Sequence, residues 1–227
     1  MSIYSGPEIV NDGLVLHLDA ANPISYSGSG TVWKDLSGNE YNFTLYNSPI
    51  HTGKTFHFDG INQYASIGSS GLNLSPTGTR TLEIWFRVIT TPLYLAGLLA
   101  DQNSTSGAFM MRPEGYLVWR WDDSNITDST SHQINESTWY QATVSLRNSY
   151  YVTYYINGEI DTPEFRTTDT GSSGVSSWSI ARQNRLFDTN GYLYLNCEVA
   201  IVRQYNRLLQ PLEIKQNYIA TKGRFGL

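Results

Sequence analysis

The segment covering residues 81–88 alternates between apolar and polar side chains, which strongly limits how it can fold. Leu82, Ile84 and Phe86 would lie on one face of an extended strand, and Glu83 would lie on the other. Successive side chains of a β-strand point to opposite faces, so this period of two predicts a half-buried strand. We expect the apolar face to enter the core and Glu83 to stand in solvent.

Similar strand patterns recur along the chain, separated by Gly, Asn, Ser or Pro clusters. They cover residues 14–18, 43–46, 55–58, 64–67, 108–112, 116–121, 139–146, 150–156, 177–181 and 192–205. Asn157-Gly158 follows one of them and predicts a tight hairpin, because a type I′ turn needs positive φ at both central residues. Many short strands without alternating helices predict an all-β, two-sheet antiparallel sandwich rather than an α/β fold.

One helix is expected near the C-terminus. Pro211 suits a first helical position, where its missing N–H costs nothing, and Gly223 suits the end. Leu212, Ile214 and Ile219 would supply its apolar face.

The chain divides into three predicted parts: an N-terminal arm (1–12), a sandwich domain (13–219) and a C-terminal tail (220–227). The tail either packs back onto the body or reaches a neighbouring molecule. Segment 122–137 is the most loop-like stretch of the interior.

Composition excludes several classes of function. Of 227 residues, 15 % are charged, below the usual quarter, and the net charge is −5. No Lys/Arg cluster offers a face for nucleic acid. No apolar run reaches membrane-spanning length, so no membrane insertion is expected. The first residues lack the pattern of a secretory signal, which favours synthesis in a cytoplasm. The single cysteine, Cys197, lies in an apolar stretch and is expected to be buried.

An ordered series of motifs resembles the laminin-G-like / concanavalin A-like superfamily in its pentraxin-like branch. The series comprises Phe56–Gly60, Tyr64–Ile67, Thr81–Val88, Trp139-Tyr140, Tyr155–Glu159, Ser179–Ala181, Glu198–Leu209 and Glu213-Ile214. The resemblance covers about residues 55–215 and implies a jelly-roll sandwich of two antiparallel sheets with one short C-terminal helix. Asp59-Gly60 belongs to the series, although its local interpretation is a turn.

The flanking segments resemble lectin-like domains in virion proteins of large tailed bacteriophages. The opening matches at 13–23 and 33–39, and the close matches at 220–227. This resemblance implies a virion location, capsid or tail proteins as partners, and an oligomeric arrangement in the particle.

No catalytic residues are predicted, although the superfamily includes glycoside hydrolases. Those enzymes need two carboxylates across the scissile bond. The Glu-x-Asp-x-x-Glu run of laminarinase-like members is absent here, and Glu83 stands alone on its strand face. The resemblance places Glu198 and Glu213 where the family has structural acids. The four histidines have no metal-ligand spacing.

The resemblance implies a calcium site as the possible cofactor site. Calcium takes six to eight oxygen ligands from loops. The matching positions are Asp101, Asn103, Gln183, Asn184 and Asp188. Two arginines, Arg182 and Arg185, stand where further acids would strengthen the site, so an ordinary Asn/Asp-rich turn is the alternative.

A sugar-stacking surface is a further hypothesis. Tyr116, Trp119 and Trp121 could offer aromatic faces to sugar rings, but Trp119 and Trp121 share one strand face and at least one of them suits the core. The sequence thus predicts a non-enzymatic virion protein with a lectin-like domain for surface or cell-surface carbohydrate contacts. A soluble lectin and a glycoside hydrolase are the alternatives.

Overall fold

The structure is a computed structural model that describes seven stretches of the chain. These are residues 7–68, 79–101, 107–120, 126–148, 151–166, 177–183 and 193–227. Within them, nearly all regular structure is extended, as the alternating patterns predicted.

The first sheet has the order β14-β13-β12-β7-β18-β5-β4, with β1 paired to the other half of β18, and every pairing is antiparallel. Its strands are β1 (Leu14–Asp19), β4 (Ile50–His51), β5 (Phe56–Asp59), β7 (Arg80–Val88), β12 (Trp139–Arg147), β13 (Tyr151–Ile156), β14 (Glu159–Arg166) and β18 (Asn196–Tyr205).

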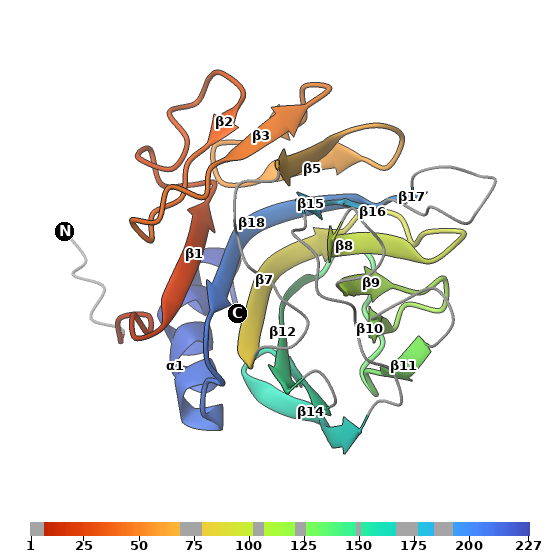
Figure 1. The fold of residues 1–227 in the computed structure, drawn as a ribbon. Helices are drawn as coiled ribbons and strands as arrows, with labels where there is room; N and C mark the ends of the chain where they lie inside the picture. The colour runs from red at the N-terminus through yellow and green to blue at the C-terminus, as the bar shows by residue number, and fades with distance from the viewer. Residues whose placement is uncertain are drawn as a thin grey trace.

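The second sheet has the order β11-β10-β9-β8-β15-β6-β3-β2 and packs against the first (Figure 1). Its strands are β2 (Val32–Trp33), β3 (Phe43–Tyr46), β6 (Tyr64–Ile67), β8 (Ala96–Asp101), β9 (Ala108–Met111), β10 (Leu117–Arg120), β11 (Ile126–Ser129) and β15 (Trp178–Ile180). A separate short ribbon joins β16 (Arg182–Gln183) to β17 (Leu193–Tyr194). The predicted two-sheet antiparallel sandwich is confirmed.

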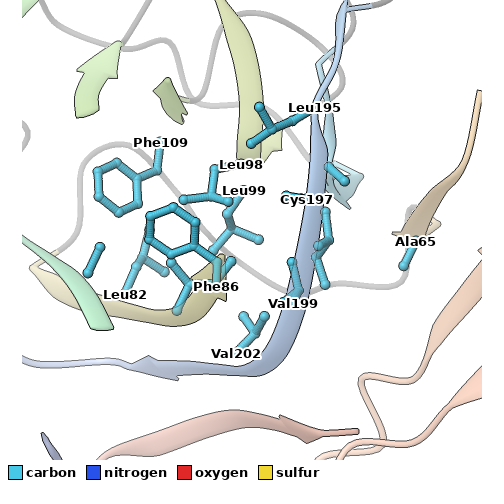
Figure 2. Packing of buried hydrophobic residues seen from close by; sticks show 14 of the residues in the cluster. Ala65, Leu82, Phe86, Leu98, Leu99, Phe109, Leu195, Cys197, Val199 and Val202 are labelled. Atoms are coloured by element: carbon cyan, nitrogen blue, oxygen red, sulfur yellow. The ribbon is translucent and has the colours of Figure 1, made fainter. Parts of the chain in front are cut away.

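The core lies between the two sheets and is built from the predicted apolar faces. Leu82, Ile84 and Phe86 of β7 are fully buried in it, as is Cys197 of β18. Figure 2 shows part of this core, with Phe86 near the centre of the packed side chains. Burial raises the pKa of the Cys197 thiol, so the thiol stays protonated and behaves as a small apolar group.

The hairpin between β13 and β14 follows the prediction from Asn157-Gly158. These two residues have φ of 52° and 77°. A side chain at Gly158 would meet Tyr218 of the helix at 2.8 Å, so glycine is required there for space as well as for its backbone angle.

The predicted helix exists, but its predicted apolar face is correct only at Ile214. α1 spans Pro211–Lys222 with Pro at its first position, and a 3₁₀ turn, η1 (Gly223–Phe225), follows it. Its buried residues are Ile214, Asn217 and Thr221, whereas Leu212 and Ile219 are exposed. The reason is that α1 covers a polar part of the first sheet, where amide and hydroxyl side chains find partners. No described helix is long and apolar enough to cross a bilayer.

Glu83 is also placed differently from the prediction. Its side chain has no exposed surface and lies under α1 on the outer face of the first sheet. Arg203 Nη1 donates to Glu83 Oε1 at 2.5 Å, and Asn217 Nδ2 donates to Glu83 Oε2 at 2.9 Å. The alternation in 81–88 is real, but a second layer covers the polar face, so both faces of β7 are buried.

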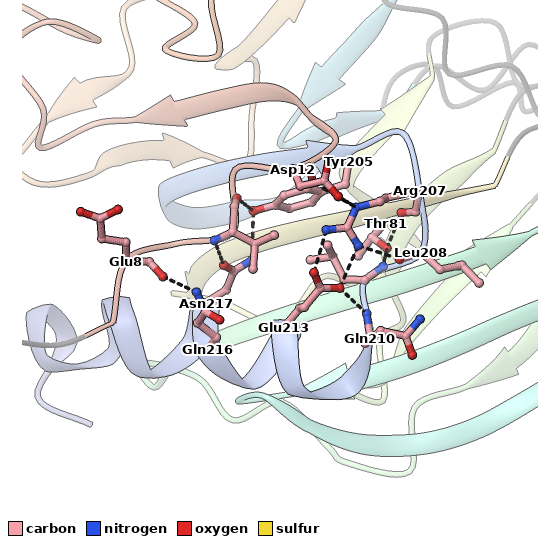
Figure 3. A network of polar contacts seen from close by, with 12 residues as sticks. Glu8, Asp12, Thr81, Tyr205, Arg207, Leu208, Gln210, Glu213, Gln216 and Asn217 are labelled. Atoms are coloured by element: carbon pink, nitrogen blue, oxygen red, sulfur yellow. Dashed lines mark hydrogen bonds and ion pairs between the residues drawn. The ribbon is translucent and has the colours of Figure 1, made fainter.

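Polar contacts hold the N-terminal residues 8–12 against α1 and β18 (Figure 3). The Val10 N–H donates to Asn217 Oδ1 at 2.8 Å, and the Tyr205 hydroxyl donates to the Val10 carbonyl at 3.0 Å. Gln216 Nε2 donates to the Glu8 carbonyl at 2.7 Å. Residues 8–12 are therefore part of the folded body rather than a free arm.

The predicted tail also packs back onto the body, which was one of its two expected fates. The boundary predicted after residue 219 falls inside α1. Phe225 stacks on Trp85 and contacts Trp139, with ring centroids 4.5 Å apart in both cases. Arg224 forms two hydrogen bonds to the Asp19 carboxylate, at 2.7 and 2.9 Å.

Several short strands were not predicted. β8 is apolar without alternation and contains Gly97, and β11 lies within the predicted loop 122–137. Pairing with neighbouring strands stabilises both β8 and β11, and this pairing cannot be predicted from the local sequence pattern.

Candidate functional site

The predicted sugar-stacking residues are described only in part, and one of them, Trp119, lies away from the surface. Trp119 is fully buried in the core, stacked on Trp178 with ring centroids 6.5 Å apart. Its place on β10 explains this, because Leu117 and Trp119 share the inward face. Tyr116 is half-buried just before β10, and Trp121 lies outside the described residues. Trp119 therefore belongs to the core, the alternative left open for it.

The predicted calcium residues are only partly described. Asp101 ends β8 opposite Trp178, whereas Gly97 of the same strand lies against the backbone of Gln183. Four residues of strand, about 13 Å, thus separate Asp101 from Gln183 along the sheet. Gln183 is also buried. The backbone therefore places these two residues well apart, and the side chain of Asp101 lies outside what the structure describes. Asn103, Asn184 and Asp188 lie outside the described residues, so a site built on them stays a prediction.

The described residues instead form an open cleft where three connections meet at one end of the sandwich. Its volume is about 620 Å³. The lining comes from the β5–β6 turn, the β7–β8 connection with the first residue of β8, and β17 with the start of β18. The lining residues are Asp59, Gly60, Ile61, Thr90, Thr91, Pro92, Leu93, Tyr94, Ala96, Leu193, Tyr194 and Asn196.

Asp59 organises the first of these connections. Its Oδ1 accepts hydrogen bonds from the backbone N–H groups of Ile61, Asn62 and Gln63, at 2.8, 3.1 and 3.2 Å. Burial opposes ionisation of this carboxyl, but these backbone hydrogen bonds outweigh it, so the pKa of Asp59 lies below its usual value. Gly60 has φ of 73°, and a Cβ there would meet Asn196 at 2.8 Å, so the turn requires glycine.

Asn196 pairs with Asp59 at the start of β18 and links this turn to the β7–β8 connection. Its Nδ2 donates to Thr90 Oγ1 at 3.3 Å, and its backbone carbonyl accepts the Ile89 N–H at 3.0 Å. Glu136 Oε1 accepts both the N–H and the hydroxyl of Thr91, at 2.6 and 2.8 Å. These anchors hold the cleft walls in a fixed arrangement before any ligand arrives.

Large apolar side chains stand exposed around the cleft. Leu93, Ile61 and Tyr94 are 87 %, 73 % and 61 % exposed. An exposed aromatic ring beside a polar cleft suits ligands that present both a C–H face and hydroxyl groups. Beyond Tyr194 the surface continues into Tyr64, with centroids 6.2 Å apart, and then Tyr46, which stacks on Tyr64 at 4.5 Å.

A second hollow, of about 560 Å³, lies beneath the C-terminal segment. Asp19, Arg203 and Arg224 line it, but Arg224 is paired with Asp19, and Arg203 is paired with Glu83. His17 also lines this hollow, and burial, followed by the charge of Arg203, lowers the pKa of His17 to about 4. The charges of this hollow already satisfy one another, so it is a weaker candidate for ligand binding than the cleft.

The remaining acids singled out from the sequence have structural partners. Arg87 pairs with Glu198 at 2.8 Å, and Arg207 forms two hydrogen bonds to Glu213. Glu213 also accepts the Gln210 N–H and so caps α1. Within the described residues, no group of three His, Cys, Asp or Glu side chains could hold a metal ion.

Sequence reasoning identified Asp59-Gly60 only as a turn and did not identify the cleft. Its parts lie far apart in the chain, and Leu93 and Tyr94 belong to no strand pattern. The available signal was the exposed apolar pair Leu93-Tyr94 directly after Pro92, in a connection between two buried strands.

Comparison with known families gives one match over most of the chain. The model of the concanavalin A-like lectin/glucanases superfamily matches residues 59–215. No curated protein matches the sequence.

Solved structures with the same fold are distant in sequence. Trypanosoma rangeli sialidase in complex with 2,3-difluorosialic acid has a TM-score of 0.70 and 14 % identity over 97 % of this chain and 36 % of that one. The binding domain of Paraclostridial Mosquitocidal Protein 1 has a TM-score of 0.68 and 19 % identity, over 92 % and 52 %. The binding domain of botulinum neurotoxin serotype D has a TM-score of 0.67 and 15 % identity, also over 92 % and 52 %. The chain thus spans between about a third and half of these structures, and the likeness concerns the fold alone.

Proposed function

Because this chain belongs to the concanavalin A-like lectin/glucanase superfamily, we propose that it is a non-enzymatic binding module that takes up carbohydrate in the cleft around Asp59. The observation that carries this proposal is the pairing of a fixed carboxylate with exposed apolar side chains. Asp59 Oδ1 is held by three backbone N–H groups, while Leu93 and Tyr94 stand exposed beside it.

Sugar rings carry hydroxyl groups on their rim and C–H groups on their faces. The carboxylate of Asp59 can accept from hydroxyls, and Tyr94 can pack against the C–H face. Because hydrogen bonds already anchor the cleft walls, little side-chain order has to be created on binding. The similar toxin structures are binding domains, which agrees with a binding role for this fold.

The test is binding of the purified protein to an array of neutral and acidic glycans, followed by titration with the best ligand. We expect Tyr94→Ala and Leu93→Ala to weaken binding at least about fivefold. Leu212→Ala is the matched control, since Leu212 is as exposed as Leu93 but lies on α1 away from the cleft. Equal loss in the control, or binding to no glycan, would refute the proposal.

The superfamily also includes glucanases, so hydrolysis is the alternative. Glycoside hydrolysis needs a pair of carboxylates roughly 5–9.5 Å apart. Among the described lining residues Asp59 is the only carboxylate, and Glu83, which the sequence presented as an exposed acid, is buried under α1. Release of reducing ends from a bound polysaccharide would contradict a purely binding role.

We further propose that this module works on a bacteriophage virion, attached to capsid or tail proteins and present in many copies. The support is the resemblance of segments 13–23, 33–39 and 220–227 to phage virion proteins. The first and the last of these segments contact each other through Asp19 and Arg224. Many weak sugar sites on one particle would give useful avidity.

Mass spectrometry of purified phage particles tests the location. Detection of the protein at a fixed ratio to the major capsid protein is expected. If the protein stays in the soluble fraction of the lysate, a free lectin becomes the better assignment. Truncating residues 220–227 would not test attachment to the particle by itself. It would also remove the contacts that Arg224 and Phe225 make with the folded body.

A further inference from the structure

We propose that the cleft selects neutral sugars and rejects sugars that carry a carboxylate. This inference rests on the proposed carbohydrate-binding function and adds the ligand class. It follows from the charges and hydrogen-bonding capacity of the groups that line the cleft.

The first observation is the sign of the charges. Among the described lining residues, Asp59 is the only side chain that is charged at neutral pH, and none of them is Lys or Arg. Glu136, which holds Thr91 at the cleft wall, adds a second carboxylate nearby. Arg182 stacks on Tyr64, with its guanidinium carbon 3.5 Å from the ring centroid, and does not line the cleft.

The second observation is which atoms remain available. Asp59 Oδ1 is occupied by three backbone donors, whereas Oδ2 has no partner among the described residues. Asn196 and Thr90 already bond to each other. The strongest available group is therefore an acceptor, so the ligand must donate, as sugar hydroxyls do.

A ligand carboxylate would bring a like charge close to Asp59 with no described cation in the lining to offset it. Two like charges about 5 Å apart at a protein surface repel enough to reduce affinity about tenfold or more, even after screening by salt. The apolar side chains Ile61, Leu93 and Tyr94 favour the uncharged C–H face of the ring and add no preference for an acid.

The experiment compares neutral and acidic sugars that are otherwise matched. Methyl glucoside and methyl galactoside are titrated against the methyl glycosides of glucuronic acid and galacturonic acid, by saturation-transfer NMR and calorimetry on the full chain. We expect at least one neutral sugar to bind, and its acidic partner to bind about tenfold or more weakly.

The variant Asp59→Asn isolates the charge. An amide oxygen can still accept the three backbone N–H groups, so the turn is retained while the negative charge is lost. We expect weaker binding of the neutral sugar and a smaller difference between the two members of each pair. Asp161→Asn is the control, because Asp161 also accepts backbone N–H groups, from Ser131 and His132, but does not line the cleft. Thermal melting checks that both variants fold.

Three outcomes distinguish a failure of this inference from a failure of the proposed carbohydrate-binding function. The inference is supported if the protein binds neutral sugars more tightly than acidic ones and this difference in affinity is smaller in Asp59→Asn. Equal or stronger binding of the acidic sugars overturns it but leaves carbohydrate binding standing. Binding of no sugar from either set, together with an empty glycan array, overturns both.

Discussion

Removing the carboxylate of Glu83 tests whether α1 truly seals the outer face of the first sheet. Glu83 is fully buried, and its partner Arg203 is 3 % exposed. In Glu83→Ala, Arg203 would keep only the 3.4 Å contact to Thr221, and Asn217 would lose one acceptor. Breaking a buried ion pair from one side costs about 3–5 kcal/mol, because the other charge is left without compensation. We expect the free energy of unfolding to fall by that amount.

Urea unfolding followed by tryptophan fluorescence measures the change, since Trp85 lies in the same covered layer. The matched control is Glu164→Ala, which removes a carboxylate from the exposed pair with Arg147 and should leave stability unchanged within error. A double variant, Glu83→Leu with Arg203→Met, should recover most of the loss, because apolar replacement removes both charges together. A cost below about 1 kcal/mol for Glu83→Ala would mean that water reaches this pair, and the covered layer would be wrong.

Three further predictions concern stability. Phe86→Ala should cost about 3–5 kcal/mol in urea unfolding, because the ring is fully buried between the sheets; a loss under about 1 kcal/mol would contradict that packing. Phe225→Ala should cost about 2 kcal/mol and alter tryptophan fluorescence, because the ring packs on Trp85 and Trp139; an equal cost for the exposed Leu212→Ala would exclude this cause. The pKa of His17 is lowered to about 4, mainly by burial, so the unfolded chain binds a proton below about pH 6.5 that the folded chain does not. Stability should therefore be level above about pH 6.5 and fall by up to roughly 3 kcal/mol as the pH drops to about 4, and His17→Gln should flatten that slope in a series of pH-dependent melts.

The features that sequence reasoning identified correctly are those set by local physics. Asn157-Gly158 specifies its turn through backbone angles alone, and Pro211 marks a helix start through its missing N–H. The inward face of residues 82–88 follows from the two-residue period of a strand. None of these inferences depends on what packs against the element.

The errors have a shared cause, which is a contact with a distant segment. Glu83 is predicted to be solvated because nothing near it in the sequence indicates that α1 will cover it. The sequence assigns the helix an apolar face of Leu212, Ile214 and Ile219, yet Asn217 and Thr221 contact Glu83 and Arg203. Polar residues at such an interface satisfy one another, so the helix has almost no amphipathic pattern from which its orientation could be predicted.

The same covering layer explains why the cleft lies at the end of the sandwich rather than on a sheet face. The outer face of the first sheet is closed by α1 and η1, with Trp85 stacked under Tyr218 and Phe225. At the end of the sandwich, by contrast, backbone and side chains emerge from β5, β7 and β18 together. There the Asp59 turn, the Thr90–Tyr94 connection and Asn196 lie within hydrogen-bonding reach of one another or line a common cleft. Such loops can change with little effect on the core, while the strands beneath them stay fixed. Variation in the ligand should therefore track residues 60–62 and 91–95, and variation in stability should track the layer beneath α1.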